Sequence, residues 1–324
     1  MQSIDFYRSA FISYLKENSQ VREPVNLYEP ITYILNLGGK RLRPVLTLLA
    51  TEIFNKDFKE SLNAALAIEV FHNFSLVHDD IMDAAPLRRG QATVHERWDV
   101  NTGILSGDAM LITAYQLFEN YEADQFRRLA QLFSTTALQV CEGQQYDIDF
   151  ENRDDVTLSE YLTMITYKTA VLVAAALKMG GIIAKASDAC QSKIYNFGLN
   201  LGIAFQLQDD YLDAFGDPKT FGKQVGGDII ENKKTVLYLK VLEQGSVLQK
   251  KELLDMYSIQ PEEPSAKIKT IKRIFMESGA AKFTQVAIAE YTDKAFKVLG
   301  ELEISEEKKE ILRGFGKQLM GREV

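Results

Sequence analysis

The stretch LAQLFSTTALQV, residues 129–140, repeats apolar side chains at the spacing of an α-helix. Leu129, Leu132, Phe133 and Val140 fall on one helical face, with Thr136 among them. The stretch lies in a long proline-free part of the chain, between Pro86 and Pro218. Proline inside a helix costs about 3 kcal/mol, and few alternating β-branched runs are present. The sequence therefore predicts an all-α protein of ten or more helices.

Helix-start signals and breaks give the expected organisation. TLSE at 157–160 is typical of a capping box, and Ser187 with Asp188 can begin the next helix. We expect no internal domain boundary, because no Ser/Gly/Pro-rich linker or composition shift divides the chain, and we predict a single domain over residues 1–324. The expected breaks between helices are Asn55–Lys59, Ala84–Gln91, Glu119–Gln125, Phe150–Val156, Phe215–Asp228 and Ser258–Pro264.

The composition narrows the class of protein. The 324 residues are 46% hydrophobic and 25% charged, which is ordinary globular composition, and the net charge is −8. That balance argues against binding to nucleic acid or to an anionic membrane. Cys141 and Cys190 suggest neither a disulfide framework nor a zinc site. We find no signal peptide and no run of about 18 apolar residues, so we expect a cytoplasmic protein without stable membrane insertion.

Two acidic clusters, DDIMD at 79–83 and DDYLD at 209–213, each follow an apolar helical run. On a helix, residues i and i+4 share a face, so each cluster aims two or three carboxylates in one direction. Carboxylate oxygens without His or Cys suit Mg²⁺, which also bridges phosphates. The alternative is a solvated acidic face, but both clusters end apolar segments, where such a face would interleave charged with polar residues.

Short motifs of basic residues supply positive charges that can balance these acids. GGKRLRP at 38–44 combines a glycine turn with three cations, and RRG follows the first cluster at 88–90. Arginine grips phosphate oxygens in pairs, whereas lysine acts as a point charge. Any one of these cations alone is more often a surface residue. Lys168 is harder to explain in that way because it interrupts an apolar run, and a phosphate partner for His72 is at least as plausible as a core role.

Taken together, the motifs resemble the trans-isoprenyl diphosphate synthases, or polyprenyl synthetases. GGKRLRP, DDIMD with RRG, KT at 168–169, FQLQDDYLD at 205–213 and GKQVGGD at 222–228 follow the family's order over nearly the whole chain. The resemblance implies an all-α fold around a deep central cavity, three Mg²⁺ ions and a homodimer. It also implies condensation of isopentenyl diphosphate with an allylic diphosphate, with diphosphate as the leaving group of a carbocation reaction.

The resemblance assigns a role to each matched residue. The metal ligands implied are Asp79, Asp80, Asp83, Asp209, Asp210 and Asp213. The residues implied to contact the allylic diphosphate are Arg88, Lys168, Lys223 and Lys233. Those implied to bind isopentenyl diphosphate are Lys40, Arg43, His72 and Arg89. Thr169 and Gln206 lie near the reacting carbons in this interpretation, and Gln144 with Asp147 matches the family's GQxxD.

Product length is expected to depend on the helix that precedes Asp79. Ser75 lies one turn before Asp79 on the same face, and Phe71 and Phe74 can close the path of the growing chain. This pattern resembles archaeal-type geranylgeranyl diphosphate synthases. We therefore expect a C20 product, with C15 farnesyl diphosphate as the alternative and C25 or longer products after it. Simple core packing of the two phenylalanines is the competing interpretation.

Two other functions fit parts of the pattern. A class I terpene cyclase also ionises a prenyl diphosphate with Mg²⁺, but its second metal motif mixes Asn, Ser or Thr, and Glu. It also has no need for the cations at Lys40, Arg43 and His72. A non-catalytic partner subunit tends to lose an acidic cluster, and this chain keeps both. We therefore expect a prenyl-transferring enzyme.

Overall fold

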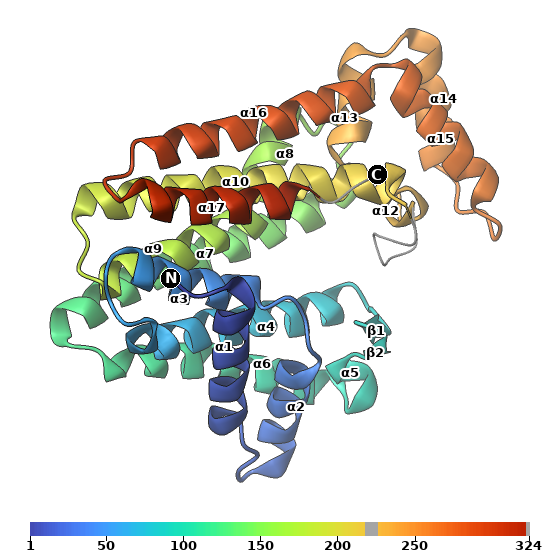
Figure 1. Cartoon of the computed structure of the whole chain (residues 1–324). Helices are drawn as coiled ribbons and strands as arrows, with labels where there is room; N and C mark the ends of the chain where they lie inside the picture. Colours follow the sequence, from blue (N-terminus) through green and yellow to red (C-terminus); the bar gives the residue numbers. More distant parts are fainter. Residues whose placement is uncertain (218–225, 322–324) are drawn as a thin grey trace. The chain divides into compact units, whose positions relative to one another are not determined.

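The structure is a computed structural model that describes residues 1–217 and 226–321 (Figure 1). The α-helices are α1 (Ile4–Asn18), α2 (Val25–Asn36), α3 (Leu42–Ile53), α4 (Leu62–Met82), α5 (Val94–Arg97), α6 (Val100–Gln116), α7 (Ala123–Glu151), α8 (Leu158–Ile165), α9 (Val171–Ile183), α10 (Asp188–Phe215), α12 (Gly227–Ile230), α13 (Val236–Gln244), α14 (Val247–Tyr257), α15 (Ser265–Glu277), α16 (Ala280–Gly300) and α17 (Glu306–Met320). Shorter elements are the 3₁₀ turns η1 (Phe58–Ser61) and η2 (Leu117–Asn120), the π-turn η3 (Thr166–Ala170), and strands β1 (Leu87–Arg88) and β2 (Gln91–Ala92). The all-α prediction is confirmed.

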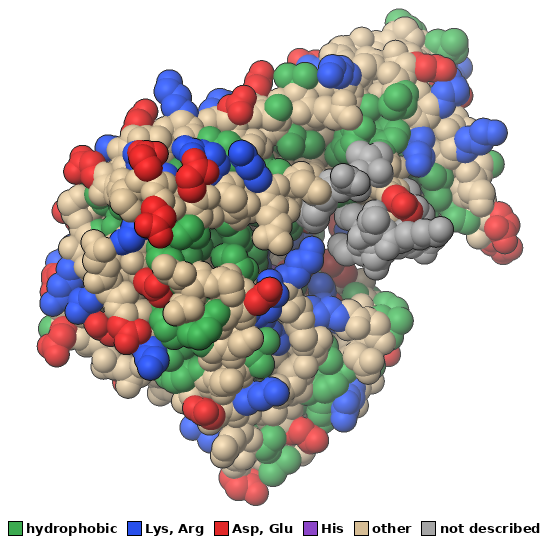
Figure 2. All heavy atoms as spheres, in the orientation of Figure 1, with side chains coloured by type: hydrophobic (Ala, Val, Ile, Leu, Met, Phe, Trp, Pro, Cys, Tyr) green, Lys and Arg blue, Asp and Glu red, His purple; other side chains and the backbone are tan. Residues whose placement is uncertain are grey.

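The chain divides into two compact units. Unit 1 comprises Met1–Thr135 and Ala175–Ser192, and unit 2 comprises Thr136–Ala174 and Lys193–Val324. The single domain expected over residues 1–324 stays a prediction. On the face of the molecule in Figure 2, acidic and basic side chains are interspersed over the surface. No broad basic footprint is therefore visible on that face, as the charge balance of the sequence suggests.

Unit 1 is built around α4. This helix packs against α3, α6 and α2, and it is apolar nearly all round, which is typical of a buried helix. Gly180 lets its own helix approach α3 closely, because an added Cβ would lie 2.6 Å from the Thr47 carbonyl oxygen. The C-terminal end of α4 carries DDIMD, so the core of unit 1 fixes the direction of the first acidic cluster.

Unit 2 has its own core, formed by residues of α8, α10, α13, α15 and α16. Leu207, Val236, Val241, Ile271 and Ile274 are buried in it. The second acidic cluster lies near the end of α10, whose preceding turns are anchored in this core. Each acidic cluster thus ends a helix that is held by a separate set of apolar contacts.

The local signals read from the sequence are largely confirmed. Thr157 and Glu160 form the predicted capping box, and the Ser187 hydroxyl accepts a hydrogen bond from the Cys190 amide. Helices end in each of the expected breaks that lie in the described residues. One difference is Pro30, which lies inside α2 rather than at its boundary. The small β1–β2 hairpin was also not predicted.

One helical segment in the described part of the chain, Leu158–Ile183, is long and apolar enough to cross a membrane by length and composition. The sequence analysis did not find it, because Lys168 and Lys178 interrupt its apolar residues. About 61% of its most apolar window is buried inside the protein, as in a core helix. The segment is therefore weak evidence for a membrane span.

Candidate active site

The first acidic cluster occupies the last turn of α4. The Asp83 amide donates a 2.9 Å hydrogen bond to the Asp79 carbonyl, so the helical pitch continues to the end of the motif. Asp79 and Asp83 therefore share a face, as predicted. Asp79 is half-buried, Asp83 is exposed and Asp80 is buried. The three carboxylates of DDIMD thus differ in their access to a ligand.

Asp80 is held by an arginine of the same unit. The Arg88 Nε atom on β1 donates to both Asp80 carboxylate oxygens, at 2.9 and 3.1 Å, and Nη2 also donates to Oδ1. Asp80 is 1% exposed, so its charge is compensated where water cannot reach it. The pair orients the β1–β2 hairpin on the end of α4. The metal role expected for Asp80 and the diphosphate role expected for Arg88 stay predictions.

Arg89 and the glycine turn are fitted to one another. The Arg89 guanidinium donates to the Gly38 carbonyl, and a Cβ at Gly39 would lie 2.9 Å from Arg89 Cζ. Gly39 has φ +120°, which L side chains rarely adopt, so both its conformation and the available space require glycine. The turn therefore brings the GGKRLRP segment and the RRG segment together. The sequence had grouped them only by charge.

Arg41 in the same segment has an internal partner. Its guanidinium donates to the Glu69 carboxylate and to the Leu35 carbonyl, and both charged side chains are almost fully buried. Arg41 adopts φ 50° at the N-cap of α3, a left-handed conformation that is uncommon outside glycine. Arg41 thus anchors the loop to α4. This leaves Lys40, which is exposed, and Arg43, which is half-buried, as the cations of the segment available to a ligand.

Cations are in excess around His72. Burial lowers the pKa of His72 well below its usual value, and the neighbouring Arg43, Arg89, Arg88 and Arg41 lower it further. Burial likewise lowers the pKa of Arg43 to about 10, with Glu69 opposing that shift. Arg43 Nε is buried and has no hydrogen-bond partner in the described residues. A phosphate oxygen at this place would accept the hydrogen bond that Arg43 Nε lacks, and its negative charge would offset the surrounding cations.

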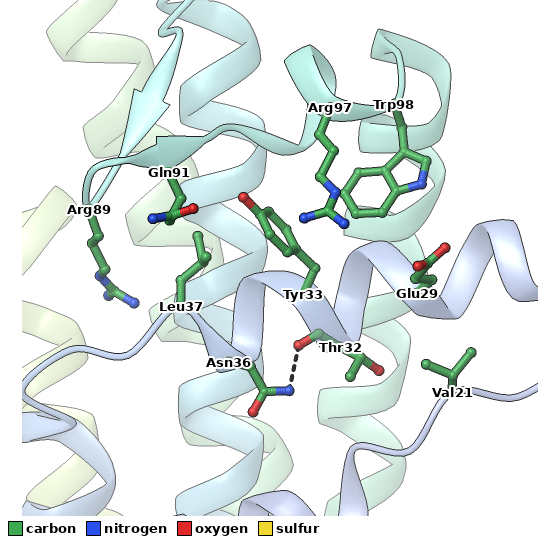
Figure 3. A pocket seen from close by; sticks show the side chains of 10 residues that line it. All are labelled: Val21, Glu29, Thr32, Tyr33, Asn36, Leu37, Arg89, Gln91, Arg97 and Trp98. Atoms are coloured by element: carbon green, nitrogen blue, oxygen red, sulfur yellow. Dashed lines mark hydrogen bonds between the residues drawn. The ribbon is translucent and has the colours of Figure 1, made fainter.

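Arg89 also lines a pocket of about 630 Å³ between α2 and the β1–β2 hairpin of unit 1 (Figure 3). On its far side the Arg97 guanidinium lies 4.5 Å from the centroid of Tyr33 and 4.8 Å from that of Trp98. The Tyr33 hydroxyl donates to the Ala92 carbonyl at 2.7 Å. The stacked side chains of Arg97, Tyr33 and Trp98 hold the hairpin against α2. They thereby support Arg89 without belonging to the cluster of cations around His72.

The second acidic cluster has different surroundings. Asp210 is buried, and it accepts hydrogen bonds from the Tyr161 hydroxyl and, at 3.0 Å, from Gln206 Nε2. Burial and the nearby charge of Asp228 raise the pKa of Asp210 to about 8, although the hydrogen bonds from Tyr161 and Gln206 oppose the shift. Asp209 and Asp213 are both half-buried. A hard cation near Asp210 would therefore relieve an unfavourable concentration of acid.

Lys168 and Thr169 lie in the π-turn η3, where the sequence had suggested a regular helix. The Lys168 ammonium donates to Asp147 at 2.6 Å, and Thr169 donates to Gln206 Oε1 at 3.1 Å. Two glycines make room for the turn. A Cβ at Gly143 would lie 2.3 Å from the Lys168 amide nitrogen, and one at Gly202 would lie 2.7 Å from Ala170 Cα. Turns of this kind are rare in proteins, and those that occur are often found at functional sites.

These contacts join five predicted site residues of unit 2 into one ion pair and one hydrogen-bonded chain. Lys168 binds Asp147, while Thr169, Gln206 and Asp210 form a hydrogen-bonded chain. Gln144 is buried on α7, and its Oε1 has no partner among the described residues. The sequence analysis predicted that these residues contact the reacting substrates. The structure shows in addition which of them bind one another.

The segment that begins at Gly226 is hydrogen-bonded to the end of α10. The Asp228 amide donates to Asp213 at 3.0 Å, and the Gly226 amide donates to the Asp213 carbonyl at 2.6 Å. Lys233 pairs with Glu231 at 3.0 Å. Burial lowers the pKa of Lys233, but the pair with Glu231 outweighs it and raises the pKa above its usual value. Lys223, also predicted to bind the allylic diphosphate, lies outside the described residues.

The three residues expected to set product length lie together on α4. The rings of Phe71 and Phe74 have centroids 5.5 Å apart, and both side chains are buried. The Ser75 hydroxyl donates to the His72 carbonyl at 2.9 Å, so it remains within its own helix. Phe71 also meets Phe133 of α7 at 5.1 Å. The phenylalanines therefore belong to a larger aromatic cluster.

The donor set fits magnesium bound together with a diphosphate. No three acidic, histidine or cysteine side chains gather into a metal cluster within the residues that the structure describes. Mg²⁺ in phosphate sites commonly takes one or two carboxylates and completes its shell with water and phosphate oxygens. Asp79 with Asp83, and Asp209 with Asp213, each offer such an incomplete set of carboxylate oxygens. The metal ligands nevertheless stay a prediction.

Comparison with known proteins identifies the family. The sequence profile of the polyprenyl synthetase family matches residues 24–275. The chain belongs to the polyprenyl synthetase family. It is 38% identical over 290 residues to the geranylfarnesyl diphosphate synthase of Natronomonas pharaonis, covering 84% of this chain and 83% of the relative. It is therefore a prenyl-transferring diphosphate synthase, and the predicted enzyme class is confirmed.

Solved structures of this family have the same fold. A crystal structure of a geranylgeranyl pyrophosphate synthase superposes with a TM-score of 0.96 at 56% identity and covers 100% of both chains. The geranylgeranyl pyrophosphate synthase of Corynebacterium glutamicum, complexed with isoprenyl diphosphate and magnesium, has a TM-score of 0.85 at 25% identity and covers 98% of both chains. The predicted isoprenoid synthase-like fold is confirmed by these polyprenyl synthetases.

Several residues that shape the site were missed in the sequence. Tyr161 holds Asp210 in place, and Glu69 holds Arg41 of the GGKRLRP segment. Glu69 could have been found from the sequence, because it is a single acidic residue within the apolar run AALAIEVF. Tyr161 had none, since its link to Asp210 joins residues that are 49 positions apart.

Proposed function

We propose that this polyprenyl synthetase makes geranylgeranyl diphosphate, a C20 product, from isopentenyl diphosphate and shorter allylic diphosphates. The observation that carries the proposal is the pair of acidic helix ends, each of which has its own cations. Arg88 pairs with Asp80 of DDIMD, and Arg89 is the next residue. In unit 2, Lys168 pairs with Asp147, and the adjacent Thr169 is linked through Gln206 to Asp210 of DDYLD. Acids suited to a divalent cation beside cations suited to phosphate are the groups that a metal–diphosphate complex requires.

The metal ligands are assigned by the access of each carboxylate. Asp79 and Asp83 in unit 1 and Asp209 in unit 2 are the carboxylates that would hold Mg²⁺, with Asp213 beside Asp209 and with Asp80 and Asp210 as buried support. Three ions per chain follow the family's pattern. Bound Mg²⁺ would neutralise the charge that develops on the departing diphosphate, the largest electrostatic demand of the reaction.

The two diphosphates are assigned to different sets of cations. Lys40, Arg43, His72 and Arg89 would bind isopentenyl diphosphate, supported by the unsatisfied Arg43 Nε and the excess of cations around His72. Arg88, Lys168 and Lys233, together with Lys223 of the undescribed segment, would contact the allylic diphosphate. In the first set arginine forks dominate, which suits a substrate whose diphosphate stays bound throughout the reaction.

The remaining groups act on the hydrocarbon. The allylic C1–O bond breaks, the double bond of isopentenyl diphosphate forms a new bond to C1, and the product loses a proton to the released diphosphate. Thr169 and Gln206 offer oxygen dipoles to the transient cation, while Asp147 accepts a hydrogen bond from Lys168. Gln144 has a buried side-chain oxygen without a partner among the described residues. No protein nucleophile is needed.

Product length is assigned to α4. Phe74 would end the path of the growing chain, with Phe71 behind it and Ser75 leaving space beside it. The geranylgeranyl synthase neighbour at 56% identity favours C20. The relative named geranylfarnesyl synthase makes C25 the nearer alternative, and C15 remains the outcome expected if bulk lies closer to Asp79.

A homodimer and a cytoplasmic location complete the proposal. Leu105 and Ile112 lie on one face of α6 and are 60% and 58% exposed, which is unusual for large aliphatic side chains on a helix. By analogy with the family, a second copy of the chain would cover this face of α6. Dilution-dependent sedimentation of the wild type and of Leu105→Glu would test it, and a monomer in both cases would refute it.

The deciding experiment is product analysis. The purified protein is incubated with Mg²⁺, isopentenyl diphosphate and, in turn, dimethylallyl, geranyl and farnesyl diphosphates, and products are read by mass spectrometry. A C20 product from each substrate is expected. A C15 or C25 end point would overturn the assigned length while keeping the enzyme class. A cyclic hydrocarbon would point to a terpene cyclase, and no elongation would point to a partner subunit without activity of its own.

A further inference from the structure

A histidine outside the proposed substrate and metal sites touches the phenylalanine that would set product length. His78 lies one helical turn after Phe74 on α4, and the two rings meet edge to face with centroids 4.7 Å apart. The other side of the imidazole faces α6, where Nε2 donates to the Ile104 carbonyl at 3.3 Å. The ring of His78 therefore bridges Phe74 and the backbone of a neighbouring helix.

This bridge exists because residue 107 is glycine. A Cβ built at Gly107 would lie 2.2 Å from His78 Nε2 and 2.6 Å from Cδ2, far inside any real contact. Gly107 is a buried residue within α6, and its conformation is helical, so the reason for glycine here is space rather than backbone freedom. The glycine gives the imidazole one place to lie, between α6 and Phe74.

The opposite side of Phe74 is also supported. Phe71 lies at 5.5 Å, and Phe71 in turn meets Phe133 at 5.1 Å. Phe133 contacts Tyr115 of α6 and Phe118 of η2, at 4.8 and 5.2 Å. Phe74 is only 9% exposed, so its ring has little freedom while both neighbours remain. Of the two supports, His78 is the one whose position depends on a single glycine.

We propose that His78 and Gly107 are positioning residues for product length, which they set by fixing the ring of Phe74. The proposal rests on the proposed function, in which Phe74 ends the path of the growing chain. Without the imidazole, the Phe74 ring can turn into the vacated space and the path becomes longer. With a methyl group at residue 107, the imidazole must leave its position, and the support of Phe74 changes.

The first test measures the ratio of C25 to C20 product in His78→Ala. Loss of one aromatic contact corresponds to roughly a two- to tenfold change in a product ratio, and the ratio is expected to rise. A merely structural role for His78 would lower total turnover without moving this ratio. An unchanged or lower ratio in active His78→Ala would overturn the proposal.

The second test uses the glycine and a double variant. Gly107→Ala is expected to shift the product distribution away from that of the wild type, because the new Cβ and the imidazole cannot both remain. In the His78→Ala background the same methyl group meets no ring, so adding Gly107→Ala should cause no further change in the product distribution. Such non-additivity is the signature of two residues in direct contact. Additive effects of the two changes would contradict the proposal.

A matched control and a separate readout keep the outcomes distinct. Gly103→Ala changes another glycine of α6, where the added methyl meets the flexible end of Ile81 at 2.8 Å, and it should leave product length unchanged. Phe74→Ala tests the proposed function itself. If Phe74→Ala lengthens the product and His78→Ala does not, the inference about His78 fails alone. If Phe74→Ala has no effect, the assigned length determinant fails.

Discussion

The two acidic clusters have the same pattern but opposite surroundings. Around DDIMD the cations are in excess. Burial lowers the pKa of His72 and the neighbouring arginines lower it further, while Arg88 compensates the buried Asp80. Around DDYLD the acids are in excess. Burial raises the pKa of Asp210 and the charge of Asp228 raises it further, although Asp210 is held by neutral donors. A repeated motif therefore does not imply a repeated site. Beside its acids the first region carries cations suited to an anion, whereas the second region concentrates acids that a cation would neutralise.

The largest effect is expected from removing the carboxylates that would hold Mg²⁺. Asp79→Ala should lower kcat by roughly 10³-fold or more, since a metal's charge stabilisation is worth several kcal/mol. Asp209→Ala should cost less, roughly 10²-fold, because the family resemblance implies two of the three ions at DDIMD and one at DDYLD. Steady-state kinetics at saturating Mg²⁺ would compare them, with Asp293→Ala on the exposed side of α16 as the control. Near-normal turnover of Asp79→Ala would remove the basis of the metal assignment.

The second effect is a loss of stability when Arg88 is removed. Arg88→Met leaves the Asp80 carboxylate buried without its cation, and we expect the free energy of unfolding to fall by about 2 kcal/mol. Urea denaturation monitored by the single tryptophan, Trp98, would measure the change in unit 1. Asp80→Asn in the Arg88→Met background should recover part of the loss, because the buried charge is then gone. No recovery would argue that Arg88 acts through packing alone.

The corresponding change in the second cluster should be smaller. Tyr161→Phe removes one hydrogen bond to Asp210, and we expect a loss of about 1 kcal/mol. The loss is limited because Asp210 can stay protonated, as its raised pKa indicates, and keeps the bond from Gln206. Thermal unfolding without Mg²⁺ would detect it. A loss as large as that of Arg88→Met would show that the two clusters are held alike, and the contrast between them would fail.

The smallest effect concerns the protonation of His72. Its pKa lies below the value of about 6.5 for an unfolded chain, so the unfolded state binds more protons between these two values. This contribution to stability is therefore present above pH 6.5 and is lost as the pH falls below it. Because the chain has three histidines, NMR titration with a His72→Gln reference spectrum would assign the resonance.

Ligand binding should reverse this shift. A diphosphate at Arg43 and Arg89 would offset the cations that disfavour imidazolium, so binding would raise the pKa of His72. Affinity for isopentenyl diphosphate should then increase modestly as the pH falls below about 6.5. An affinity that does not respond to pH in this window, in the wild type and His72→Gln alike, would place His72 away from the anion.

The sequence predicted what depends on local patterns. The capping box at Thr157, the shared face of Asp79 and Asp83, and the breaks between helices all follow from spacings of a few residues. The π-turn at Lys168 could not be predicted in this way, because it depends on Gly143 and Gly202 from two other helices. Arg41 shows the same limit, since its charge suggested a ligand contact while Glu69 uses it internally.

The π-turn has a consequence for how this region tolerates change. A turn of this kind holds one residue more than the α-helix it interrupts, so the side chains before and after it are out of phase by about 100° relative to a regular helix. Deleting one residue within Thr166–Ala170 would restore a continuous register and rotate Tyr161 away from Asp210, or Ala170 away from Gly202. Both the length and the residue types of Thr166–Ala170 are therefore constrained by the helices that contact this segment.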